Sequence, residues 1–170
     1  GPSKARMPRC NPAPAAWPIP RKSSRRFSAS SKNNLRGIRV LVSAGPTWEA
    51  WDPIRIITNR STGAMGYAIA EAFRDAGARV TLVSGPVNRP APRGVHVVRV
   101  ESARQMLAAM LRESRRARII IGTAAVVDYL PAHVSTGKLK KTHGPISLHL
   151  VRNPDILATL GRLRLRRGGP

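Results

Sequence analysis

Cysteine is nearly absent from this chain, which has a single one, Cys10, among 170 residues. One thiol excludes an internal disulfide framework and any metal site built from several cysteines. No uninterrupted apolar run approaches the ~18 residues that suggest a membrane span. The histidines show no metal-ligand spacing, so we interpret all four as structural or surface groups: His96, His133, His143 and His149.

Acidic residues are also scarce, since eight Asp and Glu stand against 30 Lys and Arg for a formal net charge of +22. Residues 1–34 hold eight of the basic residues and residues 161–170 hold four, and neither end contains an acid. The segment 35–160 is therefore only moderately basic, as suits a domain that handles phosphorylated anions.

The N-terminal segment 1–34 contains six prolines and no periodic pattern, which predicts a disordered basic tail. It lacks the continuous apolar core of a signal peptide, and we expect a cytoplasmic protein with no membrane partner. The basic ends leave open a non-enzymatic module that binds nucleotides or RNA. They show no interleaving of aromatic and basic residues and no RNA-binding motif, which disfavours nucleic acid as a partner.

Strand-like and helix-like patterns alternate through the central segment. The predicted strands are Gly37–Ala44 (apolar on both faces), Arg79–Ser84, Val95–Val100, Ala117–Ala124 and, as an antiparallel or edge strand, Ile146–Val151. The predicted helices are Tyr67–Ala76, ended by Gly77; a helix from the capping box Ser102–Gln105 to about Arg115; and a last helix with Asn153 as N-cap and Pro154 at its first position. This alternation predicts an α/β fold: a three-layer, doubly wound, mostly parallel, Rossmann-like sheet.

A long loop, Gly45–Gly66, joins the first predicted strand to the first predicted helix. It leaves the carboxyl end of a strand, where open α/β sheets bind their ligands. The loop ends in the small-residue turn Ser61-x-Gly63-x-x-Gly66, whose free N–H groups suit an anion at a helix start. The same turn is also explained as a purely structural helix start. It is not the dinucleotide fingerprint, which disfavours an NAD-binding module.

Two polar residues lie just upstream of this turn. Arg55 can hold a carboxylate or phosphate through two parallel hydrogen bonds, and Asn59 can hold a carbonyl oxygen. The alternative interpretations are a surface ion pair for Arg55 and loop capping for Asn59.

Small residues and a carboxylate follow the fourth predicted strand. The small residues let a ligand approach the backbone, and Asp128 can bind Mg²⁺ carried by a nucleotide, although a lone Asp there is also an ordinary turn residue. Further on, Lys138, Lys140 and Lys141 lie in a polar loop. That loop is either simply solvated or a flap that neutralises a triphosphate.

Five motifs, taken together and in this order, resemble those of the phosphopantothenoylcysteine synthetase (phosphopantothenate–cysteine ligase) domain. In bacteria this domain is usually the C-terminal half of the bifunctional coenzyme A biosynthesis flavoprotein. The motifs are Gly45–Glu49 with Asp52–Arg55, Thr58–Gly66, Ala124–Tyr129, Lys138–Lys141 and Asn153–Leu157. The resemblance covers about residues 37–160.

The resemblance implies a ligase of coenzyme A biosynthesis that works in two steps with Mg²⁺. The carboxylate of 4′-phosphopantothenate attacks the α-phosphate of CTP, giving an acyl-cytidylate and pyrophosphate. The amine of cysteine then attacks the acyl carbon and releases CMP. A carboxylate is a poor electrophile, which explains the need for activation and for donors already in place around the developing charge.

The resemblance also implies roles for single residues. Asn59 would hold the carbonyl of the acyl intermediate, and Arg55 would reach a substrate bound to the neighbouring subunit of a homodimer. Four residues would bind phosphopantothenate through its phosphate: Gly45, Ser61, Gly63 and Gly66. The CTP site would comprise Gly122, Thr123, Ala124, Asp128, Lys138, Pro154, Asp155, Ile156 and Leu157, with Asp128 as the metal ligand and Lys138 as a catalytic residue on the phosphates.

The chain departs from the family pattern at three positions. Ala64 stands where a lysine is common, which removes one charge beside the phosphate; Thr62 replaces a serine and Val127 an alanine. The family continues with segments that complete the nucleotide pocket, so we expect a C-terminally truncated chain with an incomplete sheet. We also expect this chain to lack the flavin-dependent decarboxylase half, and with it FMN. Residues 11–30, back-translated in another frame, resemble the end of that half, which leads to the hypothesis that residues 1–34 are an out-of-frame remnant; a native tail is the alternative.

Overall fold

The computed structural model describes residues 35–140 and 144–166. The predictions made for residues 1–34, for Lys141 and His143, and for residues 167–170 lie outside the described residues. Within the described helices, no stretch is long and apolar enough to cross a membrane.

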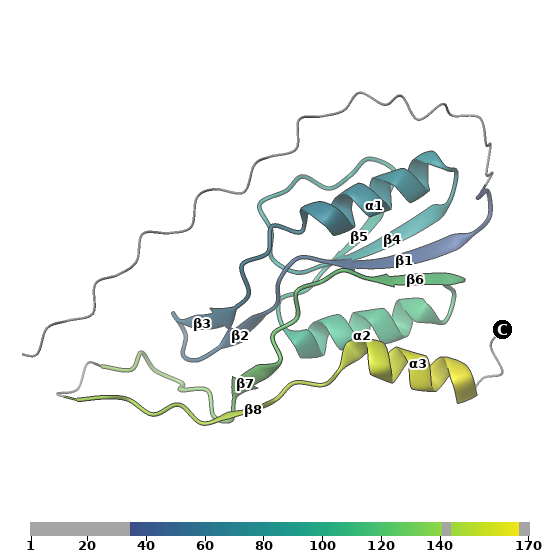
Figure 1. Ribbon diagram of the computed structural model, residues 1–170. Helices are drawn as coiled ribbons and strands as arrows, with labels where there is room; N and C mark the ends of the chain where they lie inside the picture. The colour runs from purple at the N-terminus through teal and green to yellow at the C-terminus, as the bar shows by residue number, and fades with distance from the viewer. Residues whose placement is uncertain (1–34, 141–143, 167–170) are drawn as a thin grey trace, which may run out of the picture. The chain divides into compact units, whose positions relative to one another are not determined.

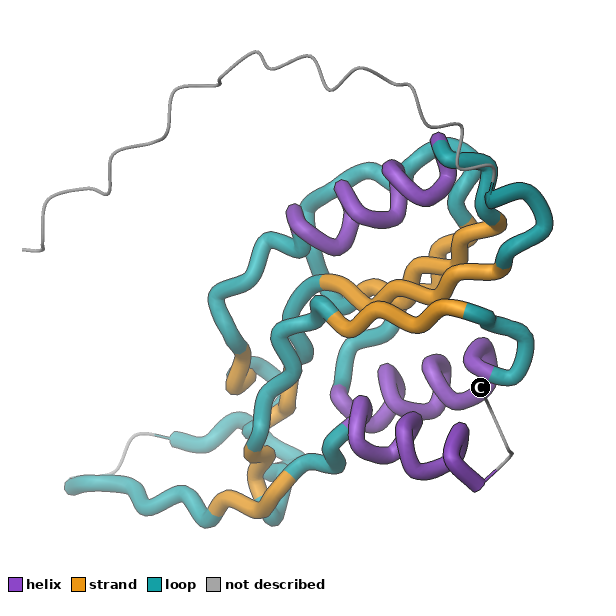
Figure 2. The backbone as a smooth tube through the Cα atoms, turned by 45° about the vertical axis from the view of Figure 1, so that its right-hand side comes forward, coloured by secondary structure: helices purple, strands orange, loops and turns teal. Residues whose placement is uncertain are grey.

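Four parallel strands form the central sheet in the order β5-β4-β1-β6. The strands are β1 (Arg39–Ala44), β4 (Arg79–Ser84), β5 (His96–Arg99) and β6 (Ile119–Gly122). Helix α1 (Ala64–Asp75) covers one face, and α2 (Ala103–Ser114) and α3 (Ile156–Arg166) cover the other (Figures 1 and 2). The predicted three-layer, doubly wound arrangement is confirmed.

Strand β1 holds the two cores together because its side chains alternate between the two faces. Val40 and Val42 pack toward α1, whereas Leu41 packs toward α2 and α3. All three are at most 1% exposed, as the prediction of burial on both faces requires. Each such side chain contributes about 1.5–3 kcal/mol through burial.

Helix α1 begins earlier than the sequence predicts, at Ala64 rather than Tyr67. Gly63 has φ of 69°, a left-handed conformation that glycine adopts without strain, and the good helix formers Ala64 and Met65 then continue directly into the helix. The predicted end at Gly77 is confirmed. The N–H of Gly77 donates to Arg74 O (2.8 Å) and that of Ala78 to Phe73 O (3.0 Å), a Schellman motif.

The segment predicted as a continuous loop contains an antiparallel hairpin of β2 (Trp48–Ala50) and β3 (Ile56–Thr58). Its strands are only three residues long, which is too short for an alternating pattern to show in the sequence. The buried carboxylate of Glu49 accepts from Ala103 N (2.8 Å) at the start of α2. This hydrogen bond ties the hairpin to α2, in the helical layer formed by α2 and α3.

The start of α2 matches its prediction with one change. Ser102 Oγ accepts from Gln105 N (3.2 Å), as in a capping box, but Gln105 Oε1 accepts from Glu101 N (2.8 Å) instead of from Ser102 N. The helix buries Met106 and Met110 fully and Leu107 and Leu111 partly.

Two predictions for the C-terminal part need correction. The predicted strand Ile146–Val151 is shorter and shifted, and it lies outside the central sheet, whereas the antiparallel pairing given as one alternative is confirmed. The observed β8 (Leu150–Arg152) pairs antiparallel with the unpredicted β7 (Tyr129–Pro131) in a separate two-stranded sheet. All three residues of β8 are exposed, so this strand lacks the buried face that a place in the central sheet would require.

The N-cap of α3 is Asp155 rather than Asn153. Asp155 Oδ1 accepts from Ala158 N (2.8 Å), while Asn153 Nδ2 donates to Val127 O (2.8 Å). The side chain of Asn153 is thus bonded to the loop after β6, and the carboxylate of Asp155 accepts from one N–H group of the first helical turn. Pro154 accordingly lies before the helix, not in its first turn.

Candidate functional site

A cavity of about 310 Å³ lies at the carboxyl ends of β1 and β6. These adjacent strands continue on opposite faces of the sheet, and such a switch point is where open α/β folds bind ligands. The cavity is lined by Ser43, Gly122, Ala124, Val126, Val127, Asp128, Asn153, Pro154, Asp155, Ile156 and Leu157. The predicted CTP residues from two distant segments, 122–128 and 154–157, are therefore brought together.

Two residues predicted for the CTP site do not line this cavity. The hydroxyl of Thr123 donates to Ser43 O and lies on the α1 side of the sheet, close to Gly66. This follows from strand alternation, which turns Thr123 away from the face used by Gly122 and Ala124. Lys138 is exposed on the segment after β7.

The cavity wall depends on the missing side chain of Gly122. A Cβ at this position would lie 2.7 Å from Leu157 Cδ2 and 2.8 Å from its Cδ1. Glycine therefore lets the start of α3 come up against the end of β6. Ser43 Oγ accepts from the N–H groups of Thr123 (3.3 Å) and Ala124 (3.4 Å), which fixes the backbone beside the opening.

Asn59 lies next to the same wall. Its Nδ2 donates to Ala125 O (3.3 Å) and to Val126 O (3.0 Å). Two donated bonds hold the plane of the amide, so the side chain is oriented by the loop after β6. Asn59 therefore does more than cap its own loop, although its chemical role stays a prediction.

Backbone bonds join this wall to the small-residue turn. Ala125 N donates to Gly45 O (2.8 Å), and a Cβ on Gly63 would be only 3.3 Å from Gly45 N. Gly45 and Gly63 both have positive φ, 78° and 69°, so the close approach needs two glycines. A Cβ on Gly66 would be 2.5 Å from Ala44 Cβ. Three of the residues predicted to bind phosphate, Gly45, Gly63 and Gly66, are thus packed together at the carboxyl end of β1.

The turn itself uses its own hydroxyl groups. Ser61 Oγ accepts from Gly63 N (3.3 Å), and Thr62 Oγ1 accepts from Ala64 N (3.4 Å). A residue that sequence reasoning missed, Arg89, donates through Nε to Thr62 O (3.0 Å) and places a guanidinium beside the turn. Nothing in the sequence of the Gly85–Gly94 loop singles out this arginine.

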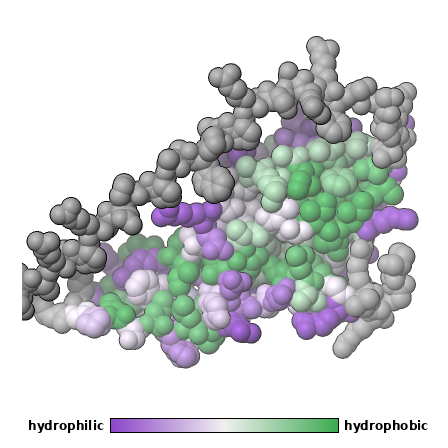
Figure 3. All heavy atoms as spheres, in the orientation of Figure 1, coloured by the Kyte–Doolittle hydropathy of each residue, from purple (hydrophilic) through white to green (hydrophobic). Residues whose placement is uncertain are grey.

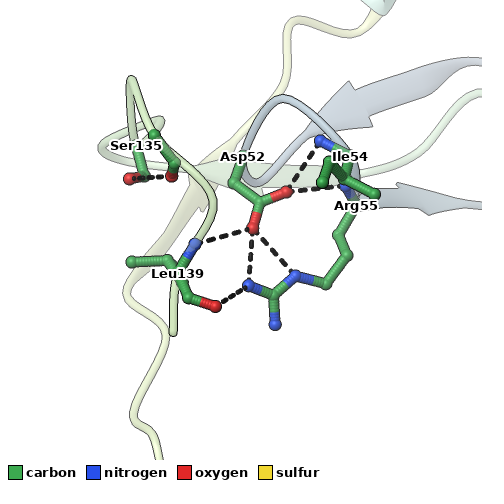
Figure 4. Close-up of polar contacts among 6 residues, drawn as sticks. Asp52, Ile54, Arg55, Ser135 and Leu139 are labelled. Carbon is green, nitrogen blue, oxygen red and sulfur yellow. Dashed lines mark hydrogen bonds and ion pairs between the residues drawn. The ribbon is translucent and has the colours of Figure 1, made fainter. Parts of the chain in front are cut away.

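Arg55 forms an ion pair, as one of the two interpretations predicted, but its partner Asp52 is buried and does not lie on the surface. Its Nε and Nη2 lie 2.8 and 2.5 Å from Asp52 Oδ2 (Figure 4), and its guanidinium carbon lies 4.4 Å from the ring centre of Trp51. This pairing, aided by backbone N–H donors, holds the pKa of Asp52 well below its usual range. Sequence reasoning quoted Asp52 as part of a motif without giving it a role.

The carboxylate of Asp128 is exposed where it lines the cavity. Across residues 35–140 and 144–166, no group of three or more His, Cys, Asp or Glu side chains is placed to hold a metal ion. Asp128 alone therefore suits an ion that brings most of its ligands with it, as Mg²⁺ does on a triphosphate.

Comparison with known proteins gives a consistent picture. A family model described as DNA/pantothenate metabolism flavoprotein C-terminal domain matches residues 35–167. The coenzyme A biosynthesis bifunctional protein CoaBC of Haemophilus influenzae is 47% identical over 138 residues, which is 81% of this chain and 34% of that protein. The chain thus spans about a third of the length of the curated relatives it matches.

Solved structures share the fold. The crystal structure of the C-terminal domain of CoaBC is 45% identical with a TM-score of 0.69, covering 78% of this chain and 62% of that one. A mutant of Cab2 in complex with phosphopantothenate-cysteine is 16% identical with a TM-score of 0.63, over 74% of this chain and 59% of that one. This second likeness concerns the fold alone.

Proposed function

Because this chain belongs to the family of DNA/pantothenate metabolism flavoprotein C-terminal domains, we propose that it is a phosphopantothenate–cysteine ligase of coenzyme A biosynthesis. The observation that carries the proposal is one cavity at the switch point of the sheet, lined together by Gly122, Ala124, Asp128 and residues 154–157. The relationship to CoaBC, a coenzyme A biosynthesis protein, supports the pathway.

In the first step, the carboxylate of 4′-phosphopantothenate attacks the α-phosphate of CTP, and pyrophosphate leaves. CTP would occupy the cavity against the bare backbone of Gly122 and the loop that begins at Pro154. Lys138 would neutralise charge on its phosphates. Asp128 would hold Mg²⁺ that arrives with the nucleotide, and that ion would supply further neutralisation of phosphate charge.

In the second step, the amine of cysteine attacks the acyl carbon and CMP leaves with the oxygen that bridged acyl carbon and phosphorus. Asn59 would hold the acyl carbonyl, and its fixed amide supports this role because a pre-oriented group loses little freedom when charge develops. The phosphate of the acid would lie at the turn of Ser61, Gly63 and Gly66 beside Gly45. Arg89 would supply a cation there, since Ala64 cannot.

The active form would be a homodimer in which Arg55 reaches a substrate bound to the partner. Large apolar side chains are exposed on the two hairpins, namely Trp48, Ile54, Ile56, Tyr129, Leu150 and Val151. Figure 3 shows apolar side chains gathered over β2, β7 and β8, and β2 and β7 are in contact. An apolar surface shared by two small sheets supports association with a second copy.

An isotope-transfer assay tests the chemistry directly. Phosphopantothenate labelled with ¹⁸O in its carboxylate is incubated with CTP, cysteine, Mg²⁺ and the 170-residue chain. The acyl-cytidylate route predicts one ¹⁸O atom in each CMP released, together with pyrophosphate. Pyrophosphate release without the acid, or CMP free of label, would contradict the proposal.

A further inference from the structure

The peptide group of Leu139 is held at both of its polar atoms by the turn between β2 and β3. Leu139 N donates to Asp52 Oδ2 (3.3 Å), and Arg55 Nη2 donates to Leu139 O (3.0 Å) (Figure 4). Leu139 stands between Lys138 and Lys140. The backbone at these two lysines is therefore fixed without using either lysine side chain.

Asp52 is the centre of this contact. Its side chain is fully buried, and both of its oxygens accept hydrogen bonds. Oδ1 accepts from the N–H groups of Ile54 (2.8 Å) and Arg55 (2.7 Å), and Oδ2 accepts from the guanidinium of Arg55 and from Leu139 N. A buried carboxylate with this many donors is held ionised and in one rotamer.

A second backbone contact fastens the same segment to the same turn. Ser135 N donates to Trp51 O (3.1 Å), and the ring of Trp51 carries the guanidinium of Arg55. Residues 135–139 are thus attached at both ends to residues 51–55, although about 85 positions separate them in the chain. Two anchors define the position of the segment, where one would leave it free to swing.

We propose that Asp52 is a positioning residue of the ligase: with Arg55 it latches the 135–140 segment onto the β2–β3 turn and so sets where Lys138 stands relative to the nucleotide cavity. Asp52 touches no substrate and acts through the peptide of Leu139. The role of Lys138 rests on the proposed function, whereas the latch is a property of this chain that needs no substrate to be measured.

Amide hydrogen exchange of the full 170-residue chain, without substrates, tests the latch. Asp52→Asn keeps the shape but removes the charge and turns an N–H₂ group toward donors. We expect the exchange of the Leu139 amide to rise at least tenfold, while amides in β1 and β4 stay protected. Unchanged exchange at Leu139 would overturn the proposal.

A matched control comes from the other buried carboxylate of the hairpin. Glu49→Gln alters a carboxylate bonded to Ala103 N in α2, and it should leave exchange at Leu139 within about twofold of the parent chain, because it does not touch the latch. If Asp52→Asn fails to fold, Arg55→Gln removes the other half of the latch and keeps Asp52. It should raise Leu139 exchange at least threefold, and no rise would reject the latch.

Nucleotide binding separates positioning from a merely structural role. Asp52→Asn should weaken CTP affinity about tenfold or more, and where turnover is measured it should raise KM for CTP and leave KM for cysteine unchanged. A simple loss of folded protein would lower kcat and move neither KM. A parent chain that forms no product would count against the ligase, yet Leu139 exchange would still decide the latch. Faster exchange with unaltered CTP affinity would overturn the positioning role.

Discussion

The methyl groups of Leu157 occupy the space that a side chain on Gly122 would need, with Cδ2 only 2.7 Å from where a Cβ would be. Leu157 is the second residue of α3 and Gly122 is the last of β6. The absence of one side chain thus allows a helix start and a strand end, 35 positions apart, to form one wall of the cavity.

Gly122→Ala should therefore distort the cavity. The new methyl group would collide with the tip of the Leu157 side chain, which has to turn or shift, at a cost of about 1–3 kcal/mol in stability. CTP affinity, measured by titration calorimetry, should fall at least tenfold. Gly161→Ala is the control on the same helix, because a Cβ there meets nothing within 4 Å and should stabilise the helix by about 0.5–1 kcal/mol. Full CTP affinity in Gly122→Ala would show that the wall is not part of the nucleotide site.

Asn59→Asp should separate the two halves of the reaction. The amide now donates to Ala125 O and Val126 O, and a carboxylate would face these oxygens with no proton to donate. We expect CTP binding to persist while product formation falls at least a hundredfold, as for loss of a charge-stabilising group. Pyrophosphate release and product formation are measured in parallel. Normal turnover by this variant would remove Asn59 from the chemistry.

Arg89→Ala should weaken the hold on the acid. A charge-assisted hydrogen bond to phosphate contributes about 1.5–3 kcal/mol, so KM for phosphopantothenate should rise about tenfold or more with little effect on KM for CTP. Arg93→Ala is the control. Arg93 lies on the same loop, and it accepts a hydrogen bond from Arg74 through its backbone oxygen, which the substitution leaves in place. An equal rise in KM for phosphopantothenate in both variants would show that only the net charge of the loop matters and that Arg89 has no specific role.

The stability contributed by Asp52 should depend on pH in one direction. Its pKa in the folded chain is lowered from the ordinary value of 3.8, first by the side chain of Arg55. Ionised Asp52 therefore stabilises the fold at neutral pH, and this stabilisation is lost as the pH falls below about 4. Urea unfolding at pH 7, 5 and 3 should show the gap between parent and Asp52→Asn narrowing only at pH 3. A gap of constant size would mean that the charge does not matter.

Gly85→Ala should be the most damaging of these changes for folding. A Cβ at Gly85 would lie 1.7 Å from Pro46 O, a backbone atom that cannot move aside by rotating. We expect a loss of at least about 3 kcal/mol, within the range of severe core changes, measured by denaturant unfolding. Gly137→Ala, where a Cβ meets nothing within 4 Å, should change stability by less than about 0.5 kcal/mol. A mild effect at Gly85 would indicate that the chain around Pro46 is not held rigidly.

The parts of the fold that sequence reasoning predicted are those with local causes. Strand β4 was predicted to the residue, because an apolar β-branched run is bounded by Gly77 and Gly85 within a few positions. The predicted order of strand, helix and strand then leaves few topologies, since parallel connections are right-handed. Seven of the nine predicted CTP residues line one cavity because the motif positions fall at strand ends.

The parts that were missed depend on distant partners. Strands β2, β3 and β7 have three residues each, so their pairing is set by what lies across from them and not by their own pattern. The choice of Asp155 over Asn153 as N-cap depends on Val127 O, a carbonyl 26 positions away. The importance of Asp52 becomes visible only when Leu139 is seen beside it.

The strand order β5-β4-β1-β6 has a consequence for dissecting the protein. A cut in the exposed chain near Gly94 would leave Ser43 on one piece and Gly122 on the other, although both border the same cavity. Neither piece would contain the complete lining of the cavity, so the CTP binding proposed for this cavity would require the two pieces to associate. In a split version of this domain, binding of CTP would therefore measure how much of the two pieces has reassembled.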